Sequence, residues 1–260
     1  MTKLEKLKAD LRGLGELAVA FSGGADSSLL LRAAHDALGE RAIGITIRSP
    51  YMSSREIAEA VEFAHAYGIR HEILELGVAD EIKNNPENRC YLCKKAVFSR
   101  LIECAKGLGF SRVADGTNRD DLSEHRPGLK AKEELGVLSP LINLTKAEIR
   151  ELSRELSLPT AEKPGYACLL TRLPHGREIE LSELNLIEAA ENLLIASGYA
   201  NVRARCDRKN IKLQMPFSSM GDFLNDAKFK SVVRQLVTLG AAEVTLDLKG
   251  LREDVLHERG

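Results

Sequence analysis

The chain has 260 residues, of which 44% are hydrophobic and 29% charged, enough for one sizeable α/β domain and a smaller partner domain. Its 37 basic and 38 acidic side chains leave a formal net charge of −1, which argues against gripping nucleic acid through phosphate neutralisation alone. The sequence contains no apolar run of about 18 residues that would predict a membrane span. Residues 1–15 are charged and helical in pattern, without an apolar signal core, so we expect a cytoplasmic protein.

Short apolar runs alternate with helical patterns over the first half of the chain. The expected strands are 16–22, 41–49, 71–76 and 111–118, and the expected helices are 26–39, 53–68 and 94–109. This alternation predicts crossover connections and a parallel sheet with helices on both faces. The charged stretch 119–136 is interpreted as a solvated connector. Thr145, with Glu148 three residues later, predicts a capping box for a helix over 145–156.

The pattern changes in the last third of the chain. A helix is expected over 180–198, strands over 200–207 and 210–216, another helix over 226–240 and a last strand over 242–248. This order is typical of a small α+β domain of the antiparallel type. We place the boundary near Gly176, which gives domains 1–176 and 177–260.

A glycine pair follows the first expected strand, in Ser22-Gly23-Gly24-Ala25-Asp26-Ser27. The position between a buried strand and a helix is where α/β sheets bind ligands. The glycines permit positive φ and close backbone approach, and the helix N-terminus directs N–H groups at an anion. Ser22 and Ser27 add hydroxyl donors, while Asp26 either caps the helix or holds a magnesium ion. The Gly-Lys-Ser/Thr ending of a Walker A loop is missing, which disfavours a kinase or simple NTPase.

This segment resembles the SGGxDS pyrophosphate loop (PP-loop) of the N-type ATP pyrophosphatases, which have the adenine nucleotide alpha-hydrolase-like fold. The resemblance implies that ATP is cleaved between its α- and β-phosphates. A substrate oxygen is adenylylated, and a nucleophile then displaces AMP. The loop leaves the nucleophile open among ammonia, an amine and sulfur.

The five cysteines bear on that choice. Cys90 and Cys93 form a CxxC pair, which suits one metal or cluster, half a zinc knuckle or a redox pair. Cys168, in a loop, is interpreted as a small buried residue, as a third ligand of a 4Fe–4S cluster with one open iron, or as a nucleophile whose own sulfur is given up. Cys104 falls on an apolar helix face and is expected in the core. Cys206, in an expected strand, is interpreted as structural.

Longer segments narrow the resemblance. Five of them resemble the LarE family of ATP-dependent sulfur transferases, which build the nickel-pincer nucleotide cofactor of lactate racemase: SGGADSSLL, NRCYLCKKAVF, ADGTNRDDLSEHRPGLKAKEELGVLSPL, TKAEIRELSREL and EKPGYACLLTRLPHGREI. The family's substrate is pyridinium-3,5-biscarboxylic acid mononucleotide, whose carboxylate becomes a thiocarboxylate with ATP and Mg²⁺. Some members sacrifice one cysteine, and members with three use a 4Fe–4S cluster. Because Cys90, Cys93 and Cys168 are all present, we expect the cluster version.

The loop, the strand ends and the resemblance together suggest binding residues. Those expected at the nucleotide are Ser22, Gly23, Gly24, Asp26, Ser27, Arg48, Asp115, Thr117 and Asn118. Those expected at the substrate are Asp121, Arg126, Arg172, Glu191, Arg203, Arg205 and Asp222, and Asp120 is a further magnesium or substrate contact. The arginines would screen the phosphates and the dianionic substrate, although any single arginine also fits a solvated surface position.

After Arg205 the family usually has histidines and a Gly-Asp turn, whereas this chain has Cys206-Asp207-Arg208-Lys209. Family members form homo-oligomers, often hexamers, through this region, so a homo-oligomer is expected with its assembly open. The sulfide donor is also unidentified.

Three other functions compete with the sulfur transferase. A tRNA thiolase is disfavoured by the near-neutral charge and by the lack of further CxxC pairs. An amidating ligase of the NAD-synthetase kind would not need the three cysteines. A non-catalytic nucleotide-binding regulator would need the loop but not reactive thiols.

Overall fold

The computed structural model describes residues 1–122, 127–199 and 201–251. The chain forms two compact units, which are described separately: unit 1 is Met1–Ile82 with Glu87–Tyr166, and unit 2 is Lys83–Pro86 with the chain from Ala167 onward. The switch to unit 2 thus comes before the Gly176 boundary suggested by the sequence. Lys83–Pro86 belong to unit 2 because Asn85 Nδ2 donates to the Pro174 carbonyl at 2.8 Å and the Gly176 N–H donates to the Asn85 carbonyl at 3.1 Å.

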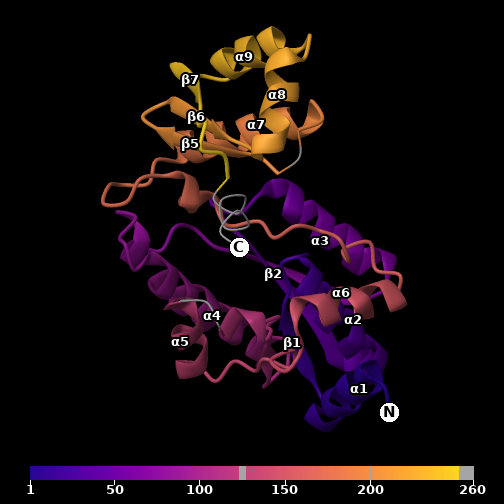
Figure 1. Ribbon diagram of the computed structural model, residues 1–260. Helices are drawn as coiled ribbons and strands as arrows, with labels where there is room; N and C mark the ends of the chain where they lie inside the picture. Colours follow the sequence, from indigo (N-terminus) through magenta and orange to yellow (C-terminus); the bar gives the residue numbers. More distant parts are fainter. Residues whose placement is uncertain (123–126, 200, 252–260) are drawn as a thin grey trace. The chain divides into compact units, whose positions relative to one another are not determined.

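Unit 1 alternates strands and helices, as the sequence predicts (Figure 1). Its elements are α1 (Lys3–Leu14), β1 (Leu17–Ala20), α2 (Ala25–Leu38), β2 (Ala42–Arg48), α3 (Ser54–Ala66), β3 (Arg70–Glu75), α4 (Arg89–Gly107), β4 (Val113–Ala114), α5 (Pro127–Glu134) and α6 (Lys146–Glu155). The expected capping box is present at α6, where Thr145 and Glu148 bond reciprocally.

The sheet of unit 1 is parallel, in the order β3-β2-β1-β4. From β1 the chain moves outward through β2 to β3 and then returns to β4 on the other side of β1. The strand order therefore reverses between β1 and β4, and ligands bind at such a switch point, beyond the carboxyl ends of the strands.

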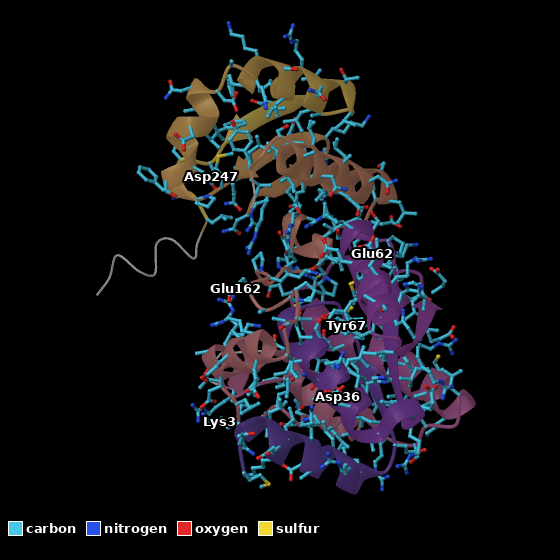
Figure 2. All side chains as sticks on the ribbon, turned by 90° about the vertical axis from the view of Figure 1, so that its right-hand side faces the viewer. Lys3, Asp36, Glu62, Tyr67, Glu162 and Asp247 are labelled. Carbon is cyan, nitrogen blue, oxygen red and sulfur yellow. The ribbon has the colours of Figure 1, made fainter. Side chains whose placement is uncertain are left out.

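Successive residues of β1 point to opposite faces of the sheet, and helices cover both faces. Leu17 and Val19 pack with buried residues of α1, α2, α3 and α6. Ala18 packs on the other face with Leu101 and Ala105 of α4. Charged side chains also link neighbouring helices, as where Asp36 of α2 accepts from Lys8 of α1 and from Arg32 of its own helix (Figure 2). This arrangement confirms the predicted α/β fold with a parallel central sheet.

Unit 2 contains α7 (Leu181–Ala196), β5 (Arg203–Asp207), β6 (Asn210–Gln214), α8 (Phe217–Asn225), α9 (Phe229–Thr238) and β7 (Glu243–Leu246), preceded by a short 3₁₀ helix, η4 (Leu169–Arg172). β5 and β6 form an antiparallel hairpin, and Arg208 and Lys209 at its turn have φ values of 49° and 72°. The four residues that differ from the family pattern after Arg205 are therefore the last two residues of β5 and the two residues of the hairpin turn. Among the described residues, no helix combines the length and the apolar character needed to cross a bilayer.

Two local predictions are wrong, and one helix was not predicted. The stretch 119–136 is not only a connector, because residues 127–134 form α5, whose Lys132 is buried. The sheet of unit 2 is mixed, because β7 runs parallel to β6. Helix α8 was not predicted, since its only buried side chains, Met220 and Phe223 among those described, make too short an apolar pattern.

Candidate active site

The PP-loop lies between the carboxyl end of β1 and the start of α2. Gly23 has a φ of 71°, and a Cβ atom built there would lie 3.1 Å from Ala60 Cβ on α3. Gly24 is the N-cap of α2, and no described side chain caps this helix. The first N–H groups of a helix have no partner within it, so they can bind an anion.

The two loop serines lie together. Ser22 Oγ and Ser27 Oγ are 3.1 Å apart, and the Gly24 N–H donates weakly to Ser22 Oγ at 3.4 Å. The loop therefore brings two hydroxyls and a backbone donor to one side, as a phosphate group requires.

Asp26 lies in the first turn of α2 and does not cap it, because Gly24 holds the N-cap position. Its two carboxylate oxygens accept from Lys146 Nζ at 2.6 and 2.7 Å. Asn118 Nδ2 lies 3.4 Å from Asp26 Oδ1. The Lys146 backbone N–H also donates to Asp120 Oδ2 at 2.8 Å. Lys146 therefore links the carboxylates that follow β1 and β4.

The segment after β4 packs directly on the PP-loop. A Cβ atom at Gly116 would lie 3.0 Å from both Asp26 Cβ and the Ser27 nitrogen, so a larger residue does not fit. This contact brings the segment 115–118 to the loop. Asn118 continues the turn, where its N–H donates to Asp121 Oδ2 at 3.0 Å.

Asp115, at the end of β4, belongs to a buried ion pair with Lys132 of α5, and the two side chains are only 10% and 9% exposed. Asp115 also accepts from Thr117 Oγ1 at 2.7 Å and from Ser139 Oγ at 2.8 Å. Burial opposes ionisation of Asp115, but the charge of Lys132 and these hydrogen bonds outweigh it and lower the pKa of the carboxyl. Burial lowers the pKa of Lys132. Asp115 and Thr117 therefore fix the shape of the segment beside the loop.

Arg48 lies at the carboxyl end of β2. Its guanidinium binds Glu75 Oε1 at 2.7 Å, and its side chain is 46% exposed. Arg126 lies outside the described residues, so its expected role at the substrate stays a prediction.

The cysteines of interest are divided between the units. Cys90, which is exposed, and Cys93 lie at the start of α4 in unit 1, because the helix begins before the expected residue 94. Cys93 Sγ donates to the buried Tyr51 hydroxyl at 3.5 Å, and burial raises the pKa of the Cys93 thiol. Cys168 belongs to unit 2, where it is the N-cap of η4. In the part of the chain that the structure describes, no group of three or more His, Cys, Asp or Glu side chains is arranged to hold a metal. The common site of the three thiols therefore stays a prediction.

Two arginines of unit 2 shape the loop that carries Cys168. Arg172 binds both oxygens of Glu191, at 2.9 and 3.2 Å, with both side chains buried. Arg172 also donates to the Ala167 carbonyl at 2.9 Å. Arg205 donates to the Thr171 carbonyl at 3.1 Å. Arg172 and Glu191 thus bind each other, and their expected contact with substrate stays a prediction.

The other expected substrate residues lie on different parts of unit 2. Arg203 and Arg205 are both half-buried and alternate with the buried Ala204 and Cys206, so they share one face of β5 as predicted. Asp222 on α8 lines a pocket of about 660 Å³ together with Ser197, Gly198, Tyr199, Ser219, Asn225 and Asp226.

Known proteins resemble this chain along nearly its whole length. No protein-family model matches it. An uncharacterized protein of Synechocystis sp. is 36% identical over 98% of this chain and 97% of its own. The pyridinium-3,5-bisthiocarboxylic acid mononucleotide synthase of Lactiplantibacillus plantarum is 34% identical over 99% of this chain and 94% of its own. The chain belongs to the LarE family.

A wider relationship supports the fold of this LarE-family protein. A component of the glutamine-hydrolysing GMP synthase of Thermoplasma volcanium is 28% identical over 62% of this chain and 58% of its own. This likeness is consistent with the PP-loop ATP pyrophosphatase fold seen in unit 1. Both parts of the predicted relationship, the family and the superfamily fold, are therefore confirmed.

Three lysines of this LarE-family site were not predicted from the sequence. Lys132 binds Asp115, Lys146 binds Asp26, and Lys163 Nζ donates to the Gly23 carbonyl at 2.9 Å. None of them lies in a recognisable phosphate motif. Their position in the segments after β4, which return to the switch point of the sheet, is the sequence feature that could have predicted their place in the site.

Proposed function

We propose that this protein is an ATP-dependent sulfur transferase that converts a carboxylate of pyridinium-3,5-biscarboxylic acid mononucleotide into a thiocarboxylate. The observation that carries the proposal is the full-length likeness to a synthase of the bisthiocarboxylic acid mononucleotide. The PP-loop at the β1–β4 switch point supports the use of ATP.

In the first step, a carboxylate oxygen of the substrate attacks the α-phosphorus of ATP. The bond from that phosphorus to the oxygen bridging to the β-phosphate breaks, and pyrophosphate leaves. The hydroxyls of Ser22 and Ser27 and the N–H groups at the start of α2 would bind the pyrophosphate as its charge develops. Glycine at position 23 lets the loop adopt a φ of 71° and pack closely on Ala60 of α3, which supports the backbone shape that such a cradle needs.

Asp26 would help to hold a magnesium ion together with the phosphates of ATP, since carboxylate oxygens are ligands that Mg²⁺ prefers. When bound, the ion would shield the negative charge of the phosphates. The ammonium of Lys146, which binds the Asp26 carboxylate, supplies a further positive charge beside the PP-loop. Burial of the Asp115–Lys132 pair keeps the neighbouring segment in place.

In the second step, sulfur attacks the carbonyl carbon of the acyl adenylate. The carbon–oxygen bond to AMP breaks, and AMP leaves with that oxygen. Cys90, Cys93 and Cys168 are a donor set that suits a 4Fe–4S cluster, which would supply the transferred sulfide when bound. Cys93 must lose its proton to bind metal, against the raised pKa of its thiol.

The alternative source of sulfur is Cys168 itself. Its Sγ would attack the acyl adenylate and form a thioester. Removal of the Cys168 α-proton would then break the Cβ–Sγ bond, which releases the thiocarboxylate and leaves dehydroalanine. The chain would lose the elements of H₂S at this residue.

One experiment tests the proposal and separates the two sulfur sources. Anaerobically purified protein with ATP, Mg²⁺ and the dicarboxylate should yield AMP, pyrophosphate and a product in which sulfur replaces oxygen. The cluster predicts iron, sulfide and visible absorption that are lost in Cys90→Ala and Cys168→Ala, whereas sacrifice predicts a mass loss at Cys168. An amide product formed with ammonia, or thiolation of tRNA in place of the mononucleotide, would refute the proposal.

We also propose that the protein is a homo-oligomer that assembles through unit 2. Several large apolar side chains of this unit are exposed, including Phe217 at 69% and Leu248 at 72%. Apolar side chains favour association between subunits when they share one patch, and a Cβ atom built at Gly250, two residues after Leu248, would lie 3.6 Å from the Phe217 nitrogen. Light scattering after size-exclusion chromatography should give a mass above that of one chain, and a monomer would refute assembly.

A further inference from the structure

Lys163 binds the backbone of the PP-loop at Gly23. Its Nζ donates to the Gly23 carbonyl at 2.9 Å and lies 2.5 Å from Glu59 Oε2 on α3. The side chain is only 11% exposed, so the ammonium is held in this position. Cys168 follows Lys163 by five residues in the sequence.

The contact with Gly23 determines the direction of the next N–H group. The C=O and N–H of a trans peptide point in opposite directions, so a carbonyl held by Lys163 turns the Gly24 N–H toward the other side of the loop. This is the side on which the structure places Ser22 Oγ, 3.4 Å from the Gly24 nitrogen, and Ser27 Oγ beyond it. If the peptide between Gly23 and Gly24 flipped, a carbonyl oxygen would face the anion instead.

The role of Lys163 is separable from simple neutralisation of Glu59. Glu59 also accepts from Arg55 Nη1 at 3.3 Å, so α3 supplies a second cation for this carboxylate. The Gly23 carbonyl has Lys163 as the side-chain donor that the structure shows. Removal of Lys163 and removal of the Glu59 charge therefore have different consequences for the loop.

We infer that Lys163 is a positioning residue of the PP-loop, which fixes the peptide between Gly23 and Gly24 so that the Gly24 N–H faces the departing pyrophosphate. The inference deepens the proposed function and rests on it for the identity of the anion. It also means that the segment leading to Cys168 is attached to the loop that binds ATP.

The test uses inorganic pyrophosphate with Mg²⁺, measured by titration calorimetry on the full chain. Lys163→Met should raise the Kd for pyrophosphate by about 10-fold or more, the effect of losing a hydrogen bond to a charged group. Lys163→Arg keeps a donor and should recover most of the affinity. Lys83→Met, at an exposed ion pair with Glu178, is the matched control and should leave the Kd unchanged.

Two comparisons separate positioning from other effects. Long-range attraction is screened by salt, so a Kd ratio that vanishes between about 0.1 M and about 1 M salt would overturn the inference, and a ratio that persists supports it. Glu59→Gln should weaken binding less than Lys163→Met does, and an equal effect would assign the loss to packing of α3. Unchanged binding in a folded Lys163→Met protein, or no binding by the wild type, also overturns it.

Failure of the proposed function gives a different result. If the wild type binds pyrophosphate but forms no thiocarboxylate, the proposed sulfur transfer is wrong. The Kd values of the wild type and the Lys163 variants can still be compared in that case.

Discussion

Replacement of Lys132 by methionine tests the buried ion pair beside the PP-loop. The change removes a cation from a side chain that is 9% exposed and leaves Asp115, which is 10% exposed, without its charged partner. Breaking a buried pair in this way costs about 3–5 kcal/mol of unfolding free energy. We expect this loss for Lys132→Met in urea unfolding followed by tyrosine fluorescence, since the chain has five tyrosines and no tryptophan.

The pH dependence of this loss has a defined sign. In the wild type the pKa of Asp115 is lowered, so its stabilising contribution is present above the pKa of the unfolded chain and is lost as the pH falls through the folded value. Lys132→Met removes the charge that does most to lower the pKa of Asp115, while burial of the carboxyl continues to oppose its ionisation. The destabilisation by Lys132→Met should therefore be largest near neutral pH and shrink as the pH approaches about 4.

Two further variants make this prediction decisive. Lys95→Met breaks a pair with Glu134 whose side chains are 50% and 36% exposed, and exposed pairs contribute about 0–1 kcal/mol. The double variant Asp115→Asn/Lys132→Met removes the unpaired charge and should recover much of the lost stability. If Lys132→Met costs no more than Lys95→Met, the reasoning about this buried pair is wrong.

Three further predictions concern the loop, a helix cap and a thiol. Gly23→Ala places a Cβ atom 3.1 Å from Ala60 Cβ at a φ of 71°, which strains the loop. The Kd for pyrophosphate, measured by calorimetry, should therefore rise about 10-fold or more. An unchanged Kd would show that Gly23 does not shape the pyrophosphate site. The hydrogen bond from Lys3, followed by that from the Thr145 N–H, lowers the pKa of Glu148 from 4.5 to about 2. The stabilisation that ionised Glu148 contributes is present above pH 4.5 and is lost as the pH falls toward 2. Glu148→Gln should therefore flatten this part of the acid-unfolding curve, and an unaltered curve would contradict the assignment. Burial raises the pKa of Cys206 to about 11. Iodoacetamide at mildly alkaline pH should therefore label the exposed Cys90 before Cys206, as peptide mapping would show. Labelling of Cys206 first would show that burial does not protect this thiol.

Local sequence signals were sufficient for most of unit 1. The apolar run before the glycine pair and the helical spacing after it predicted β1, the PP-loop and α2, because these features depend on neighbouring residues. The Thr145–Glu148 capping box was predicted for the same reason. The direction of β7 was not predictable locally, because it depends on pairing with β6 across a long connection.

The site was predictable only in part, because several of its contacts join residues distant in the sequence. Lys132 reaches Asp115 from α5, and its burial does not follow from the charged stretch in which it lies. Lys163 lies 140 residues after Gly23 in the sequence, yet its ammonium donates to the Gly23 carbonyl. Arg172 and Glu191 were expected at the substrate as separate charges, and the fold pairs them with each other. A sequence shows which side chains carry charge, whereas the fold decides which of them meet.

The most direct test of the central claim is to follow an oxygen atom of the substrate. The dicarboxylate, labelled with ¹⁸O in its carboxylates, is incubated with ATP, Mg²⁺ and the protein, and the released AMP is analysed by mass spectrometry. Adenylylation of the carboxylate followed by attack of sulfur predicts one ¹⁸O atom in each AMP, with sulfur in the product. AMP without the label, or ADP and phosphate as the products of ATP, would contradict the account.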